Sequence, residues 1–269
     1  MISLQTNVTA LVAENNLSVN NQAESQAITR LTSGYRINSS GDDAAGLSVA
    51  NKYRSDTAEL SQGVKNANDG ISQLQIIDGG LNNIANILDR MKTLATESAT
   101  DTFTGDRNIL QGEYSTLLTE LDRQATNIGL NAGGSLLKSL SVYIGGGTDA
   151  TVTVDLSAAQ VDSTGLGVNG GDISTAAGAT TAIGAIETAI GNLGTAQGSV
   201  GAGENDLNYA VNLANSQISS YSAANSRIRD ADIATEAANL SRTQALSQAS
   251  VAALAQANAM PQAVLKLLQ

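Results

Sequence analysis

The sequence contains no cysteine, histidine or tryptophan, and only one phenylalanine and one proline. Without cysteine and histidine the chain can form no disulfide, no thiolate or imidazole catalyst and no zinc site of the usual kind. Only 3% of its 269 residues are aromatic, so a compact core built on large rings is not expected. Cohesion must come from many small and medium aliphatic contacts, as in helical bundles. We therefore predict no enzyme activity, no cofactor and no metal.

Positive charge and long apolar runs are also scarce. The formal net charge of −11 argues against nucleic acid or an anionic membrane as a partner. No apolar run is long enough to span a bilayer. The first basic residue is Arg30, so the N-terminus lacks the basic segment and apolar block of a Sec-type signal peptide. The sequence predicts a cytoplasmic protein, or one exported without a cleaved signal peptide.

Both ends of the chain have the pattern of long helices with few charges. Residues 1–29 carry only Glu14 and Glu24, and residues 241–269 carry only Arg242 and Lys266. Such helices need partners on more than one face, either within their own domain or on neighbouring subunits, and composition leaves both interpretations open. We predict self-association through these ends, with an interface formed by Leu4, Val8, Leu11, Val12, Val19, Leu240, Leu246, Val251, Leu254, Val264, Leu265, Leu267 and Leu268.

Three long helices are predicted between the ends, over residues 44–99, 106–129 and 179–230. Apolar residues alternate at spacings of four and three along each of them, beginning with Leu60, Val64, Ala67 and Ile71 in the first. This heptad spacing is typical of coiled-coil-like packing. It predicts an antiparallel, elongated three-helix bundle.

A short β-hairpin is predicted near residues 138–156. Residues 140–144 and 150–156 alternate between apolar and polar around three consecutive glycines, which is typical of two strands joined by a tight loop. Residues 157–178 are rich in Gly, Ser and Thr and show no periodicity, so we expect an exposed loop. Near the first helix, Asp42 and Asp43 could be paired catalytic carboxylates, but we interpret them as caps of the next helix.

The predicted fold is mainly α, with two domains. One is a two-helix coiled coil of the terminal segments, residues 1–40 with 231–269. The other is a rod, residues 41–230, which contains the three long helices, the hairpin and the loop.

Four sequence stretches carry a family resemblance: LTSGYRINS (31–39), GDDAAGL (41–47), ANDGIS (67–72) and LAQANAMPQAVLKLL (254–268). With these the chain resembles bacterial flagellin over residues 1–145 and 180–269. The resemblance implies that the terminal helices form an inner domain lining the channel of a filament, and that the rod forms the next shell. Only the loop near 157–178 stands where many flagellins insert outer domains, which implies a minimal form.

The resemblance implies a structural subunit of the extracellular flagellar filament, the propeller of bacterial swimming. Its partners would be other copies of itself, the flagellar export apparatus and its chaperone, the filament cap and the hook-junction proteins. Export would pass through the flagellum's own channel. The alternative is a flagellin-like hook–filament junction protein. Some flagellins carry a zinc-peptidase insert with a His-Glu-x-x-His motif, which a chain without histidine cannot form.

The resemblance also raises the question of recognition by the animal innate receptor TLR5. Receptor-recognised flagellins have a segment of Leu-Gln-Arg-Val-Arg-Glu-Leu-Ala type, and residues 88–95 of this chain read LDRMKTLA. Arg90 and Leu94 match that pattern, and Glu113 stands where the family's third contact lies. Asp89, Met91, Lys92 and Thr93 depart from it. Whether these residues contact a receptor or pack subunit against subunit stays open.

Overall fold

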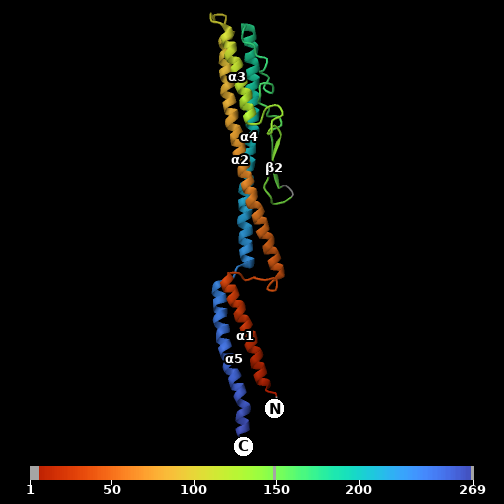
Figure 1. The fold of residues 1–269 in the computed structure, drawn as a ribbon, viewed down its shortest axis with the longest axis vertical. Coiled ribbons are helices and arrows are strands. Elements are labelled where there is room, and N and C mark those ends of the chain that lie inside the picture. Colours follow the sequence, from red (N-terminus) through yellow and green to blue (C-terminus); the bar gives the residue numbers. More distant parts are fainter. Residues whose placement is uncertain (1–5, 148–149, 268–269) are drawn as a thin grey trace. The chain divides into compact units, whose positions relative to one another are not determined.

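The computed structural model describes the backbone of residues 6–147 and 150–267, and their side chains as far as Met260. Within these residues the elements are α1 (Val8–Ser33), α2 (Ala44–Ala99), α3 (Arg107–Asn127), β1 (Ser139–Tyr143), β2 (Thr151–Asp155), α4 (Ala176–Arg229) and α5 (Ile233–Leu267) (Figure 1). The predicted order of helices and strands, and the mainly α fold with a helical bundle and a small hairpin, are confirmed.

The chain forms two compact units. The terminal unit holds the residues up to Ser55 and those from Ser220 on, and the rod unit holds Asp56–Ser219. The terminal unit thus contains α1, α5 and the adjoining ends of α2 and α4. The predicted domain borders, at residues 40 and 231, lie nearer the chain ends than these.

The core of the rod unit lies where α2, α3 and α4 pack side by side (Figure 1). Lys92 Nζ on α2 lies 3.1 Å from Glu187 Oε1 on α4, and Arg90 on α2 pairs with Glu113 on α3. Gln197 Nε2 on α4 donates to Asn82 Oδ1 on α2 (3.3 Å), so residue numbers rise along α4 as they fall along α2, and the two helices run antiparallel. Along α2 every third and fourth residue is buried, from Leu60 to Ser98. Such a repeat keeps one stripe of the helix facing its neighbours over its whole length.

The buried stripe of α2 differs in phase from the predicted one. Leu60, Ala67 and Leu74 are buried as expected, but Val64 is only half-buried and Gly63 lies in the stripe instead. The same shift occurs on α4, where the four-and-three spacing predicts Ile190, Gln197 and Glu204 in the stripe. The buried residues after Ile186 are instead Ala189, Leu193, Ala196, Val200, Gly203 and Leu207. Small residues take the alternate positions of the stripe on α4 and at Gly63 and Gly70 of α2, whereas Ile77, Ile84 and Met91 take them further along α2.

The hairpin lies against α2 and α4 at those small residues. β1 and β2 pair antiparallel with Val142 opposite Val152, and Val142 and Val154 are buried while alternate residues are exposed. A Cβ added to Gly63 would overlap the carbonyl of Ile144, and one added to Gly203 would overlap Val154. The glycines therefore permit the hairpin to approach both helices closely.

Residues 157–178 do not form the exposed loop that their composition predicted. Ala159, Val161, Leu166, Val168 and Ile173 are all at most 4% exposed. Hydrogen bonds fix the segment: the Asp162 carboxylate accepts from the distant backbone N–H of Ala132 (2.9 Å) and from the nearby backbone N–H of Gly165 (2.7 Å). Burial raises the pKa of the Asp162 carboxyl, but these hydrogen bonds outweigh it and hold the pKa below its ordinary value.

The two aspartates before α2 have different structural roles. The Asp43 carboxylate accepts from the backbone N–H of Gly46 (2.8 Å) and caps α2, as predicted. The Asp42 carboxylate accepts from the backbone N–H of Ser39 (2.9 Å) and of Asn38 (3.0 Å), and these bonds lower its pKa. Asp42 thus closes the turn that leads into the helix rather than capping it.

Candidate assembly surface

In the terminal unit α1 and α5 run antiparallel, and polar groups link them at four levels. Asn7 Nδ2 donates to the Ala257 carbonyl (2.8 Å), Asn20 Nδ2 donates to Ser250 Oγ (3.0 Å), and Ser247 Oγ donates to Asn21 Oδ1 (3.2 Å). At the other end Arg30 Nη1 lies 3.2 Å from Glu236 Oε1. We call these four contacts the polar ladder.

The remaining residues of the α1–α5 seam are mostly small. Ala27 is the only residue of α1 that is fully buried, and on the described part of α5 only Glu236 and Ala257 are. Leu17 from α1 and Leu240 and Leu254 from α5 are half-buried there. The pair therefore buries little apolar surface between its own helices, and its internal contacts alone stabilise it weakly.

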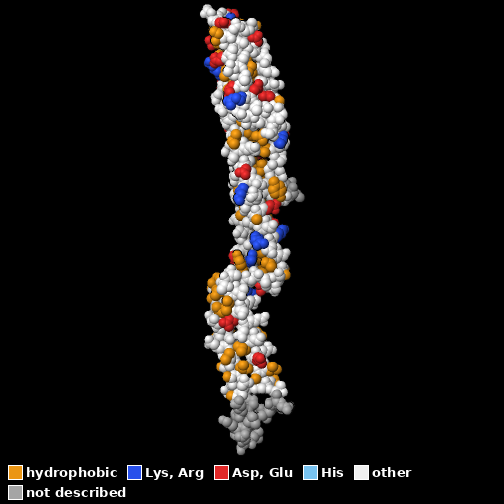
Figure 2. Space-filling view, viewed as in Figure 1, with side chains coloured by type: hydrophobic (Ala, Val, Ile, Leu, Met, Phe, Trp, Pro, Cys, Tyr) orange, Lys and Arg blue, Asp and Glu red, His pale blue; other side chains and the backbone are white. Residues whose placement is uncertain are grey.

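The larger aliphatic side chains of the pair lie outside the seam. Val8, Val12 and Val19 follow one another on the face of α1 turned away from α5. Exposed fractions are 61% for Val8, 63% for Leu11, 55% for Val12, 58% for Val19, 46% for Leu246 and 53% for Val251. In Figure 2 hydrophobic side chains are visible along this pair, with few charged ones among them. An apolar surface of this kind marks a site of association.

The predicted interface residues thus fall into three groups. Val8, Leu11, Val12, Val19, Leu246 and Val251 are exposed, whereas Leu240 and Leu254 face the seam within the chain. Leu4 and Leu268 lie outside the described residues, and Val264, Leu265 and Leu267 lie in α5 beyond the last described side chain. The sequence interpretation missed the ladder, although an asparagine at a heptad seam position is a known signal of specific helix pairing.

A short antiparallel contact joins the segments that lead out of α1 and into α5. Arg36 N–H donates to the Arg229 carbonyl (2.7 Å), and Ala231 N–H donates to the Gly34 carbonyl (2.9 Å). The Arg229 guanidinium lies 4.2 Å from the centre of the Tyr35 ring, a favourable cation–π distance. Gly34, with φ of 74°, provides the left-handed turn that ends α1. This contact holds the last turn of α1 close to the first turn of α5.

The residues of the receptor-like segment lie in the rod unit. Arg90 donates to Glu113 Oε1 from Nε (2.9 Å) and Nη2 (2.6 Å), and both side chains are exposed. Leu94 is 1% exposed and belongs to the core. The structure therefore brings Arg90 and Glu113 together at the surface and places Leu94 beneath it.

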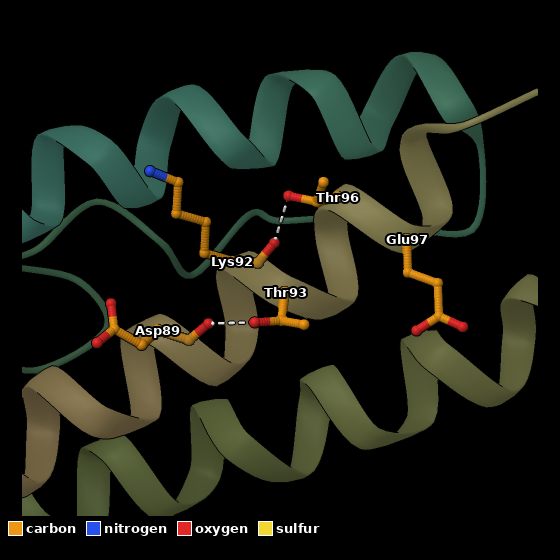
Figure 3. Close-up of a pocket in the computed structure, with 5 residues that line it drawn as sticks. All are labelled: Asp89, Lys92, Thr93, Thr96 and Glu97. Atoms are coloured by element: carbon orange, nitrogen blue, oxygen red, sulfur yellow. Dashed lines mark hydrogen bonds between the residues drawn. The ribbon is translucent and has the colours of Figure 1, made fainter.

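An open groove of about 610 Å³ follows the same turns of α2, lined by Asp89, Lys92, Thr93, Thr96 and Glu97 (Figure 3). The hydroxyls of Thr93 and Thr96 donate to carbonyls of their own helix, those of Asp89 (2.9 Å) and Lys92 (2.8 Å). Lys92 extends toward α4, where it pairs with Glu187. The hydroxyls and the ammonium group of the groove thus bind within the chain, and its polar groups do not converge on one point.

Metal-binding and membrane-spanning features are absent from the described part of the chain. No group of three or more acidic side chains there could hold a metal ion. No described helix is both long and apolar enough to cross a membrane.

Comparisons with known proteins identify both terminal regions. Residues 4–139 match the bacterial flagellin N-terminal helical region, and residues 183–268 match the bacterial flagellin C-terminal helical region. Together these matches cover both helices of the terminal pair, α2, α3 and nearly all of α4.

Relatives align along nearly the whole chain. A flagellin of Halalkalibacterium halodurans is 34% identical over 98% of each protein, and a flagellar filament core protein of Brachyspira hyodysenteriae is 32% identical over 99% of each. The flagellin of Escherichia coli K12 is 37% identical over 66% of this chain, which spans 36% of that protein. With two family regions matched and two relatives aligned end to end, the chain belongs to the bacterial flagellin family, in a form that lacks outer domains.

Proposed function

We propose that α1 and α5 bury their exposed apolar side chains against neighbouring copies of this chain, a structural subunit of the flagellar filament, during assembly. The observation that carries the proposal is the inverted character of the pair, with polar contacts in its seam and valine and leucine outside. A hook–filament junction protein is not favoured, because the end-to-end relatives are a flagellin and a filament core protein.

The energy of burial supports this role for the outer side chains. Removing a valine or leucine side chain from water is worth ~1.5–3 kcal/mol. Several such side chains on each copy therefore outweigh the weak contacts within the α1–α5 seam. In this proposal residues 1–40 and 231–269 form the inner domain of the filament, and Leu4, Val264, Leu265, Leu267 and Leu268 extend the apolar surface toward the chain ends.

The family also supports a location and further partners. A flagellin works in a filament outside the cell, and we propose that this chain is exported without a cleaved signal peptide. Its partners would be the flagellar export apparatus and chaperone, the filament cap and the hook-junction proteins. For TLR5, the exposed Arg90–Glu113 pair offers the contact surface, and the buried Leu94 would support that surface from below.

Polymerisation of the purified chain tests the assembly surface. We expect Val12→Asp and Val251→Asp to abolish the light scattering that sulfate induces in wild-type monomer, because sulfate strengthens apolar burial and a carboxylate buried without a partner is costly. Lowering the pH should partly restore assembly by protonating the new carboxylate.

A charge of the same sign on another face gives the matched control. Thr32 is exposed and lies five helical turns from Glu14, so it stands on the side of α1 that already carries a negative charge. Thr32→Asp should polymerise like wild type. Polymerisation of Val12→Asp at the wild-type rate would exclude the outer face of α1 as a subunit contact.

A further inference from the structure

Apolar burial does not decide which face of α1 meets α5. The face turned away from α5 carries Val8, Leu11, Val12 and Val19. The face in the seam carries two leucines, Leu17 and Leu31, with Ala10, Ala13 and Ala27. If burial within the pair were the only force, the valine face would gain more by turning inward. Another interaction must therefore hold the observed rotation.

The polar ladder is the feature that distinguishes the observed rotation from others. The Arg30 and Glu236 side chains are only 26% and 10% exposed, and separating such a pair leaves a charge without a partner in a poorly solvated place. Asn20 and Asn21 reach Ser250 and Ser247 from adjacent positions of α1. Any turn of α1 by one residue, about 100°, breaks these bonds.

The ladder also defines the register of the pair. Its contacts join Asn7 to Ala257, Asn20 to Ser250 and Arg30 to Glu236, so they extend over nearly the whole of α1. The backbone contact between residues 34–36 and 229–231 anchors only one end. Polar residues inside helix pairs are well known to select one register at some cost in stability.

We propose that the polar ladder fixes the rotation and register of α1 against α5, and thereby decides which valine and leucine side chains face neighbouring copies. This inference rests on the proposed function, because the selected surface matters only where copies assemble. Asn7, Asn20, Asn21, Arg30 and Glu236 are specificity-determining residues that act within one copy, while the valines and leucines form the contacts between copies.

A thiol cross-link can report the geometry, because the chain has no cysteine of its own. Asn21→Cys with Ser247→Cys places two thiols at one level of the ladder, while the other three contacts remain. A short bifunctional thiol reagent applied to the polymerised full chain should join the two cysteines within one copy. Its yield, read from the mobility of the denatured chain, measures the population with the observed rotation and register.

Charge reversal in this background tests the ladder directly. Arg30→Glu or Glu236→Arg alone places like charges at one level and should lower the cross-link yield about tenfold, with a similar loss of polymer. The double reversal should restore both to within about twofold. Glu236→Gln keeps a hydrogen-bond acceptor and should lose less than either reversal. Circular dichroism of the monomer verifies that the rod unit stays folded.

A second variant separates pairing from helix stability. Asn20→Ala with Ser250→Ala removes one level of the ladder, and alanine is the better helix former at both positions. We expect the cross-link yield to fall about threefold although helicity does not fall.

The possible results separate the two proposals. If Arg30→Glu polymerises and cross-links like the reporter alone, or if the double reversal recovers nothing, the ladder does not set the pairing. If Val12→Asp and Val251→Asp polymerise normally, the assembly surface itself is wrong, whatever the ladder variants do.

Discussion

The rod unit and the α1–α5 pair use side chains in opposite ways. In the rod unit the large aliphatics Leu74, Leu81 and Leu88 are completely buried, and charged pairs such as Arg90–Glu113 lie at the surface. In the α1–α5 pair the charged Arg30–Glu236 contact lies in the seam, and Val12 and its apolar neighbours lie outside. The rod unit buries its large apolar side chains within one chain, whereas the α1–α5 pair can bury its own only against other copies.

This difference shows that burial and helicity are separate properties of a helix. Both regions are built from regular α-helices, but only the rod repeats its large residues toward its own core. A pattern of apolar residues thus indicates that a helix face will be buried. The packing of the single chain shows whether that face is buried by the same chain or left for another copy. The exposed valines of α1 mark surface reserved for other copies.

Truncating one leucine in each region should give the largest contrast. We expect Leu81→Ala, at a fully buried position, to lower the free energy of unfolding of the monomer by about 2–5 kcal/mol. Leu11→Ala, at a position 63% exposed, should change it by less than about 0.5 kcal/mol while slowing polymerisation. Urea titration followed by circular dichroism measures the first quantity, and light scattering measures the second. Equal destabilisation by both changes would remove the distinction between the regions.

Two glycine substitutions should show whether the hairpin requires a glycine at its contact with α2. Gly63→Ala forces a methyl group onto the Ile144 carbonyl and should cost about 1–3 kcal/mol in thermal unfolding, as overpacked sites do. Gly184→Ala is its matched control, because Gly184 is a helical residue with open space around its Cβ position. That control should gain up to ~1 kcal/mol from helix propensity. A stable Gly63→Ala variant would mean that the hairpin can move off α2 without loss.

Acid should weaken the rod unit by a smaller amount. Hydrogen bonds from Arg123 lower the pKa of Glu120 to about 2, and the pKa of Asp162 is also lowered. A depressed folded-state pKa stabilises the fold above the unfolded value, near 4, and this contribution is lost as the pH falls below it. The thermal midpoint should therefore drop between about pH 4 and pH 2. Asp162→Asn should reduce both the midpoint at neutral pH and its dependence on acid; an unchanged slope would show that other carboxylates dominate.

The elements of this fold were predictable because they repeat a local pattern. Heptads predicted α2, α3 and α4, and strict alternation around a run of glycines predicted β1 and β2. The phase of the stripe was hard to predict near the hairpin, since Val64 is more hydrophobic than Gly63, yet Gly63 is the buried residue. The approach of the hairpin backbone explains that choice. Further along α2 the buried Ile77, Ile84 and Met91 are larger apolar residues than their neighbours Asp78, Ala85 and Lys92, so there the sequence itself indicates the observed phase.

In the segment 157–178 and in the candidate assembly surface, burial depends on contacts between residues distant in sequence, which a local pattern does not indicate. Val161, Val168 and Ile173 are isolated apolar residues without periodicity, and they are buried by contacts with distant elements. For the surface, charge depletion and apolar composition predicted the terminal helices and several of their exposed residues. Leu254 was assigned to the same surface, but it faces the seam. Composition could not show this, because it does not tell which face of a helix with two apolar sides packs within the chain.

The unbroken three-and-four repeat of buried residues along α2, from Leu60 to Ser98, also restricts how a gene for this chain can change in length. One inserted codon turns every later side chain by about 100° and exposes the buried stripe. About seven codons, close to two helical turns, return the stripe almost to its former direction. Because α4 packs along the same stripe, such an insertion is tolerated only with a matching one in α4. Length variation within the rod should therefore occur in paired multiples of seven codons.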